Sequence, residues 1–156
     1  ELMEVIMEGT EGDVIDYIAD FRDEWSDLPV ENISFPRSVN NLDKYHHSVY
    51  GYIKGTPIQV RGSLLYNRLL DENNLSSKYE RIQNGEKIKF TYLKEPNSLH
   101  DNVIAYVNTL PKEFGLNKYI DYDLQFEKSY IDPIKTVLDV IGWKHEKTSS
   151  LEGFFG

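Results

Sequence analysis

The spacing of the hydrophobic residues changes twice along this chain, and that change limits the folds open to it. Four apolar residues near the N-terminus recur at intervals of four, three and four positions, which places them on one face of a helix: Val14, Ile18, Phe21 and Trp25. Gly9–Gly12 separates this helix from a shorter apolar segment, and Leu28-Pro29 ends it because proline cannot continue a helix.

Helical spacing returns near the C-terminus. The apolar and aromatic positions there are Tyr122, Phe126, Tyr130, Ile134, Val137, Leu138 and Ile141. We expect Asp132-Pro133 to bend or restart the helix and Gly142 to close it.

The middle of the chain, from about Asn32 to Glu113, has a mixed pattern. Thr56–Gly62 is typical of a short extended segment, after which Ser63 is placed to cap a helix through Leu70. Asn84-Gly85 indicates a tight turn.

A strand is expected directly after that turn. Ile88, Phe90 and Tyr92 alternate there with polar residues, as in a half-buried strand. Residues 102–107 are a candidate partner strand. The chain as a whole therefore has helical ends around a mixed middle, which is an α+β pattern.

Composition excludes several classes of protein. There is no cysteine, so the chain has neither a disulfide framework nor a zinc-thiolate site. No apolar run approaches the roughly 20 residues that a membrane span needs, so we expect no membrane partner. The sequence opens with Glu1 and not with methionine, which favours a fragment or a processed chain.

The formal net charge of -9 argues at first against nucleic acid, but its distribution argues for it. Residues 1–31 carry 11 acidic residues and one basic residue, whereas residues 36–70 carry five basic residues against Asp43 alone. Such asymmetry fits a protein that meets phosphate on one face.

Motifs for independent catalysis are weak. Asp121-Tyr122-Asp123 has the spacing of a metal-binding carboxylate pair, but it stands where a helix starts, and acidic residues cap helices there. His46-His47 has no third ligand in a recognisable pattern. The sequence contains neither a glycine-rich phosphate loop nor a nucleophile elbow.

The segment 35–67 mixes cations, aromatic residues and small hydrogen-bonding residues. These are Arg37, Ser38, Asn40, Asn41, Lys44, Tyr45, Tyr50, Tyr52, Lys54, Arg61, Tyr66 and Asn67. Such a set can hold a duplex backbone, since Lys and Arg neutralise phosphates and Ser and Asn donate hydrogen bonds. The same composition also suits an ordinary soluble surface whose tyrosines half-fill a core.

Two runs of sequence, Arg37–Tyr45 and Gly55–Asn67, resemble the thumb of T-even-type phage family B DNA polymerases. The similarity continues in order through Gly85–Ile88, Asp121-Tyr122, Glu127-Lys128, Pro133 and Glu146–Phe155. The resemblance implies a mainly helical thumb around a small mixed α/β insert. It assigns 1–31 and 120–142 to the helical base, 32–119 to the DNA-facing insert and 148–156 to a clamp-binding tail.

The resemblance also implies a role in gripping primer-template duplex through the sugar-phosphate backbone and the minor groove. The residues it assigns to DNA are Arg37, Ser38, Asn40, Asn41, Lys44, Tyr45, Lys54, Arg61, Tyr66, Asn67, Lys87 and Lys89. Polymerases of this type carry their catalytic aspartates in an Asp-Thr-Asp-Ser element of the palm, which this sequence lacks. We therefore expect no catalytic or metal-binding residue and no cofactor here, with magnesium and dNTP held by the palm.

The final residues resemble a peptide that docks on a ring-shaped sliding clamp. Leu151, Phe154 and Phe155 stand at i, i+3 and i+4, so one helical turn would place them on one face. The alternative is that they fold back onto the N-terminal helix. The implied partners are duplex DNA, the clamp, and the palm, fingers and exonuclease domains, in the cytoplasm of an infected bacterium.

Two other functions stay open from the sequence. The chain could be a stand-alone nucleic-acid or clamp adaptor that shares the thumb fold. It could also be a small metal-dependent nuclease that uses Asp121, Asp123 and a histidine.

Overall fold

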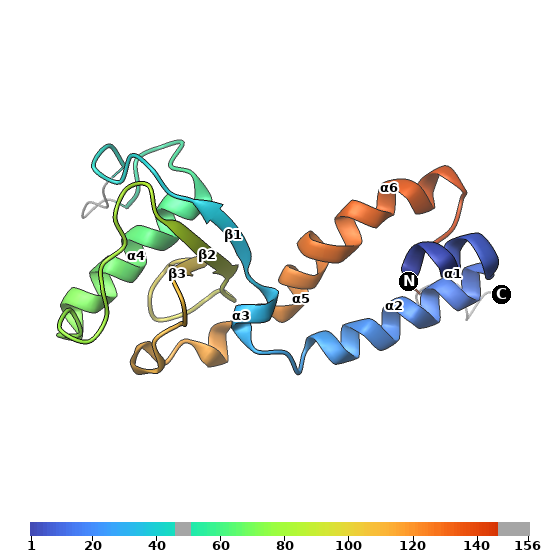
Figure 1. Ribbon diagram of the computed structural model, residues 1–156, viewed down its shortest axis with the longest axis horizontal. Helices are drawn as coiled ribbons and strands as arrows, with labels where there is room; N and C mark the ends of the chain where they lie inside the picture. The colour runs from blue at the N-terminus through green and yellow to red at the C-terminus, as the bar shows by residue number, and fades with distance from the viewer. Residues whose placement is uncertain (46–50, 147–156) are drawn as a thin grey trace. The chain divides into compact units, whose positions relative to one another are not determined.

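The computed structural model describes residues 1–45 and 51–146, which form two compact units (Figure 1). The helical unit comprises residues 1–28 and 126–146, and the sheet unit comprises residues 29–125. No helix within these described ranges has the length and apolar character needed to cross a membrane.

The helical unit begins with α1 (Leu2–Glu8) and α2 (Glu11–Trp25). Thr10 starts α2 with a reciprocal cap, in which its Oγ1 accepts from the Asp13 N–H at 3.2 Å and Asp13 Oδ2 accepts from the Thr10 N–H at 2.9 Å. Such a cap satisfies two backbone donors that a helix start leaves unpaired. The predicted apolar stripe of α2 is confirmed, with Val14, Ile18 and Trp25 buried.

The chain returns to the helical unit at Phe126, the last residue of α5 (Tyr122–Phe126). A π-helical turn, η3 (Glu127–Ile131), then leads into α6 (Asp132–Val140). The Asp132 N–H donates to Glu127 O, five residues back, and Pro133 has no N–H to donate. The predicted restart at Asp132-Pro133 and the stop at Gly142, which has φ 74°, are both confirmed.

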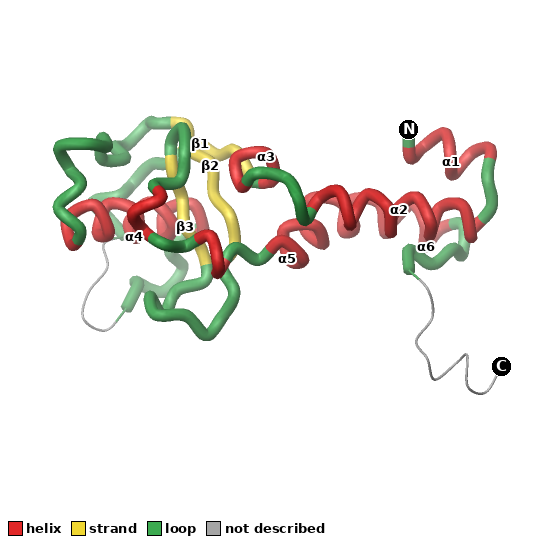
Figure 2. The backbone as a smooth tube through the Cα atoms, turned by 90° about the horizontal axis from the view of Figure 1, so that it is seen from below, coloured by secondary structure: helices red, strands yellow, loops and turns green. Residues whose placement is uncertain are grey.

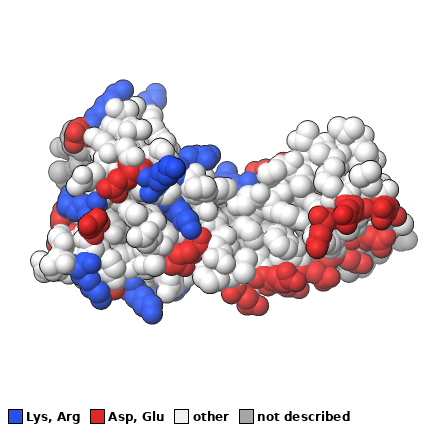
Figure 3. All heavy atoms as spheres, in the orientation of Figure 1, with Lys and Arg blue, Asp and Glu red and all other residues white. Residues whose placement is uncertain are grey.

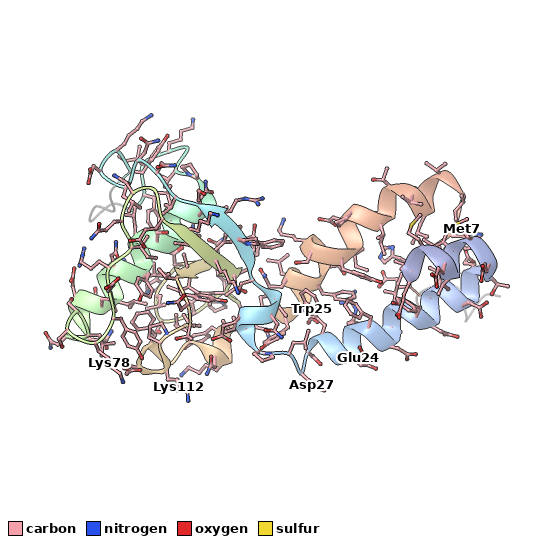
Figure 4. The ribbon with its side chains drawn as sticks, viewed as in Figure 1. Met7, Glu24, Trp25, Asp27, Lys78 and Lys112 are labelled. Atoms are coloured by element: carbon pink, nitrogen blue, oxygen red, sulfur yellow. The ribbon has the colours of Figure 1, made fainter. Side chains whose placement is uncertain are left out.

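Aromatic rings hold the helical unit together. Phe21 and Trp25 of α2 meet Phe126 with ring centroids 5.8 and 5.5 Å apart, and Tyr130 lies 4.6 Å from Phe21. Arg22 covers this cluster, because its guanidinium lies 4.5 Å from the Phe126 ring and pairs with Glu127 at 2.9 Å. Figure 4 shows Trp25 at the end of α2.

The sheet unit contains a three-stranded antiparallel sheet in the order β1 (Phe35–Ser38), β2 (Lys87–Tyr92) and β3 (Val103–Tyr106). The β2–β3 pair confirms the strand predicted from the alternation and its candidate partner at 102–107. The first strand was not predicted, because its four residues, Phe-Pro-Arg-Ser, are too few to show a period. Pro36 is tolerated since β1 lies at an edge of the sheet.

Helix α4 (Ile58–Glu72) packs on β3 and β2, as the two views in Figures 1 and 2 agree. Gly62 permits this close approach, since a Cβ built there would lie 2.9 Å from the Ala105 backbone nitrogen. The sequence interpretation of this segment was wrong in two respects. Residues 58–62 are helical and not extended, because α4 starts at Ile58. Ser63 is not a cap, because its hydroxyl donates to Gln59 O at 2.8 Å inside the helix.

Buried amides join segments of the sheet unit that are distant in sequence. Gln125 is fully buried and donates to Ile33 O at 2.7 Å, while its Oε1 accepts from the Tyr92 N–H at 3.0 Å. These bonds tie α5 to β2 and to α3 (Val30–Ile33). Two short 3-10 helices, η1 (Lys112–Phe114) and η2 (Asn117–Tyr119), complete the unit.

The α+β class expected from the sequence is thus confirmed. The roles that the resemblance gives to 1–31, 32–119 and 120–142 stay predictions. The unit boundaries lie at Leu28 and Gln125.

Candidate nucleic-acid interface

Basic residues from two distant parts of the chain lie on the neighbouring strands β1 and β2. The antiparallel register sets Ser38 opposite Lys87, Arg37 opposite Ile88 and Pro36 opposite Lys89. Arg37 and Lys87 are exposed. Lys89 is half-buried, and its ammonium donates to Glu31 O at 3.2 Å.

The loop after β1 is fixed to the turn before β2. Val39 donates to Glu86 O at 3.0 Å and accepts from the Gly85 N–H at 2.7 Å, which continues the strand pairing. The Leu42 N–H then donates to the Asn84 side chain at 2.9 Å. The predicted Asn84-Gly85 turn is present, with Gly85 at φ 87°. The loop therefore has a defined place beside Lys87.

This loop carries the small polar residues of the candidate site. Asn40, Asn41 and Lys44 are exposed, and Asn41 has φ 63°, a left-handed conformation that asparagine adopts more readily than most residues. Its carbonyl accepts from the N–H groups of Lys44 and Tyr45 at 3.0 and 3.2 Å. The Lys44 ammonium lies 5.0 Å from the Tyr45 ring centroid.

These residues form one basic edge of the sheet unit, which we call the β1–β2 edge. Its members are Arg37, Ser38, Asn40, Asn41, Lys44, Tyr45, Lys87 and Lys89. Figure 3 shows Lys and Arg side chains gathered over β1 and the loops next to it. Exposed Asp43 and half-buried Glu86 are the acidic residues within the same segments.

Lys54 stands on a separate turn of the sheet unit. The Thr56 N–H donates to Ile53 O at 3.1 Å, and the Thr56 hydroxyl donates to the same oxygen. Residues 53–56 thus form a β-turn with Gly55 as its third residue. Gly55 has φ 84°, and several β-turn types require a positive φ at that position. Lys54 is therefore exposed at the tip.

The chain is similar to two phage DNA polymerases. It is 28% identical over 156 residues to the DNA-directed DNA polymerase of enterobacteria phage T4, and 30% identical over 129 residues to that of Escherichia phage RB69. The alignments cover 97% and 80% of this chain. No family model matches the chain.

The resemblance to T-even phage polymerases is confirmed. It is consistent with a C-terminal region of such a polymerase. The chain spans only 17% and 14% of the length of the two relatives it matches.

Arg61, assigned to DNA by the resemblance, is engaged within the protein. Its Nη2 donates to Asp101 Oδ1 at 3.1 Å and to Asn102 Oδ1 at 2.7 Å. Its guanidinium also lies 5.1 Å from the Tyr52 ring centroid. The side chain is 30% exposed.

Tyr66 and Asn67 lie inside the sheet unit. The Tyr66 hydroxyl donates to Glu80 O at 3.3 Å, and burial raises the pKa of this phenol. Asn67 makes two bonds to one residue, donating to Ile82 O at 3.0 Å and accepting from the Ile82 N–H at 2.9 Å. Both residues are therefore buried, at 3% and 8% exposed, with their polar atoms bonded within the sheet unit.

The capping interpretation of Asp121 is confirmed, because its Oδ1 accepts from the Leu124 N–H at 3.0 Å. Within residues 1–45 and 51–146, no group of three or more His, Cys, Asp or Glu side chains could hold a metal ion. His46 and His47 fall outside the described residues, as do Leu151, Phe154 and Phe155 of the predicted clamp-binding tail.

Sequence reasoning missed two acidic residues that form ion pairs with basic side chains. Asp101 is 3% exposed and holds Arg61. Glu113 pairs with Lys78 at 3.0 Å and accepts from the Tyr79 hydroxyl at 2.9 Å, and the bond from Lys78 holds the pKa of Glu113 below its usual value. Neither acid stands in a motif, so only the folded contacts could identify them.

Proposed function

We propose that the sheet unit grips duplex DNA by its sugar-phosphate backbone, as the thumb part of a phage DNA-directed DNA polymerase. The observation that supports this most directly is the β1–β2 register, which sets exposed Ser38 opposite exposed Lys87. Arg37 is exposed on the other face of β1, next to the loop that carries Asn40, Asn41 and Lys44. The similarity to the T4 and RB69 polymerases supports DNA as the nucleic acid that is bound.

The chemistry of the β1–β2 edge suits contacts that do not depend on base sequence. Guanidinium and ammonium groups neutralise phosphates, and amide and hydroxyl groups donate neutral hydrogen bonds to phosphate and sugar oxygens. Side chains that reach the minor groove meet acceptors that are nearly the same for all base pairs. A replicative enzyme needs a grip of this sequence-tolerant kind.

The proposed contact surface is narrower than the set assigned from the resemblance. We place DNA at the β1–β2 edge and at Lys54, whose side chains are exposed or half-exposed. Arg61, Tyr66 and Asn67 support the fold of this surface, because their polar atoms already bind Asp101, Glu80 and Ile82. Magnesium, dNTP and nucleotidyl transfer belong to the remaining polymerase, which also supplies the other domains that this part contacts.

The test is fluorescence anisotropy with a labelled duplex of arbitrary sequence at several salt concentrations. The parent should bind in the range of about 10⁻⁴ to 10⁻⁶ M. Arg37→Ala combined with Lys87→Ala should weaken binding equally for unrelated sequences. It should also lower the slope of log K against log salt by about two, since each lost phosphate contact removes roughly 0.9.

A matched control removes the same charge elsewhere in the sheet unit. Lys112 and Lys118 are exposed on η1 and η2, and Figure 4 labels Lys112. Alanine at both positions should leave the slope unchanged. An equal loss in both double variants would show that only total charge matters, and would overturn the β1–β2 edge as the DNA surface.

We also propose that the tail 148–156 binds a sliding clamp. Three apolar side chains at i, i+3 and i+4 suit a hydrophobic pocket, and burying each contributes roughly 1.5–3 kcal/mol before ordering costs. Tethering on the same duplex makes a modest affinity sufficient. Deletion of 150–156, with the rest of the polymerase present, should abolish clamp-dependent processivity and leave short synthesis unchanged. Processivity that survives the deletion would reject the proposal.

A further inference from the structure

A buried carboxylate joins three segments of the sheet unit near the Lys54 turn. Asp101, which precedes β3, accepts hydrogen bonds from the Tyr52 hydroxyl and from Arg61 Nη2 of α4. Its Oδ1 also accepts from the Asn102 N–H at 2.9 Å. The Tyr52 hydroxyl lies 3.4 Å from Arg61 O as well. Asp101 thus links the segment before the turn, the helix after it and the sheet.

The setting makes these bonds strong. Asp101 is 3% exposed and Tyr52 is half-buried, so water competes little for the carboxylate. A hydrogen bond to an ionised group in such surroundings is about twice as strong as a neutral one. Burial, followed by the bond to Asp101, raises the pKa of the Tyr52 phenol. Like any tyrosine hydroxyl, it carries its proton at neutral pH and can donate.

The cluster holds the start of the turn that carries Lys54. Tyr52 directly precedes the four-residue turn 53–56, and only Ile53 separates it from Lys54. The far end of the turn is fixed by α4, which begins at Ile58 and contains Arg61. Asp101 therefore anchors both ends of the segment 52–61. The lysine side chain is long and flexible, so a fixed backbone at Lys54 confines the region that its ammonium can reach.

We propose that Tyr52 and Asp101 are positioning residues that hold Lys54 against a backbone phosphate of the bound duplex. The proposal rests on the proposed function, because it requires the sheet unit to grip DNA. Tyr52 and Asp101 act through the turn and make no contact with DNA themselves.

A positioning role and a purely structural role give different salt dependences. Tyr52→Phe removes a hydroxyl but no charge, so by itself it changes neither the electrostatic field nor the number of basic groups. The salt slope counts phosphates neutralised by the protein. If the hydroxyl holds Lys54 in place, an uncharged substitution lowers that count. If a variant only loses stability, the molecules that remain folded neutralise the same number of phosphates, and the slope of log K against log salt is unchanged.

The experiment is a double-mutant cycle on duplex binding, using anisotropy from 50 to 200 mM salt. Lys54→Ala should lower the slope by about 0.9 and the affinity by about twofold to tenfold. Tyr52→Phe should produce the same change. The double variant should be no weaker than either single variant, because the contact can be lost only once.

Two further variants serve as control and support. Tyr79→Phe removes a hydroxyl that donates to Glu113 at 2.9 Å in another loop, and should leave the slope unchanged. Asp101→Asn removes an acidic charge, so a simple charge effect would strengthen DNA binding, whereas loss of positioning weakens it. Circular dichroism confirms that each variant is folded at the assay temperature.

The outcomes separate the two proposals. A parent chain that does not bind duplex DNA overturns the proposed function and with it the positioning role. A parent that binds and loses affinity through Arg37→Ala with Lys87→Ala, but is unaffected by Tyr52→Phe, keeps the function and overturns the positioning role. Additive losses in the cycle also overturn it, because Tyr52 would then act independently of Lys54.

Discussion

The two units of this chain differ in charge and in what holds them together. Residues 1–28 and 126–146 carry fourteen acidic and four basic residues, whereas residues 29–125 carry eleven acidic and twelve basic residues. On the face shown in Figure 3, acidic side chains gather along α1 and α2, and basic ones gather on the sheet unit. The net charge of -9 is therefore a property of the helical unit.

The interiors of the two units also differ. Aromatic rings fill the helical unit, and its polar bonds lie near the surface, as between Arg22 and Glu127. Buried polar side chains cross-link the sheet unit through Asn67, Asp101 and Gln125. A strongly acidic chain can therefore still present a basic edge, provided that one unit carries the excess of acidic residues and the other fixes the positions of its cations.

The largest expected effect tests the aromatic interior of the helical unit. Phe126 is fully buried, so Phe126→Ala should lower the free energy of unfolding by about 3–5 kcal/mol. Both tryptophans, Trp25 and Trp143, belong to this unit, so urea unfolding followed by tryptophan fluorescence reports on it. Val140→Ala, at a position 82% exposed, should stay within about 0.5 kcal/mol of the parent. Equal losses at the two positions would contradict the assignment of the core.

The next effect tests the polar cross-links of the sheet unit. Asn67→Ala leaves the N–H and C=O of Ile82 without their partner in a buried place. Each such group costs about 1–3 kcal/mol. Circular dichroism during urea unfolding should show the loss. Asn40→Ala, on the exposed loop, is the control and should change little. A stable Asn67→Ala variant would show that water replaces the amide, and that the cross-link contributes little.

A smaller effect compares one glycine in each unit. Gly62→Ala places a methyl group 2.9 Å from the Ala105 nitrogen, and overpacking of this kind costs about 1–3 kcal/mol. Gly12→Ala in α2 meets nothing closer than Thr10 Oγ1 at 3.7 Å, and alanine favours a helix by up to about 1 kcal/mol. The melting temperature should therefore fall for Gly62→Ala and rise for Gly12→Ala. Shifts of the same sign would show that close packing is not specific to the sheet unit.

The smallest effect concerns the uneven charge. Raising salt from 20 to 200 mM screens repulsion among the acidic residues of the helical unit, and should stabilise it by less than about 1 kcal/mol. The same change should weaken DNA binding by the sheet unit. Asp16→Asn with Asp20→Asn, which removes two exposed acids of α2, should reduce the salt response of the tryptophan-detected melting temperature. A melting temperature that falls with salt would contradict this account.

Several features of the fold were predictable because they depend on local rules. The stripe of α2, the restart at Pro133, the Asn84-Gly85 turn and the β2–β3 pair all follow from periodicity, proline and glycine. The start of α4 did not, because Thr56–Gly62 has no helical period, and Ser63 is as compatible with a helix interior as with a cap. Strand β1 escaped prediction since pairing with β2, rather than its own sequence, makes it a strand.

The candidate site shows the same division. The sequence determined which residue types are present, where the charges fall along the chain, and the resemblance to phage polymerases. Only the tertiary structure decided which cations are exposed. Strand register sets Lys87 opposite Ser38 across about fifty residues of chain, while Arg61 and Asn67 bind the buried partners Asp101 and Ile82. Contacts between residues so far apart in sequence depend on strand register and on close packing, such as that at Gly62. A local sequence pattern cannot predict these contacts.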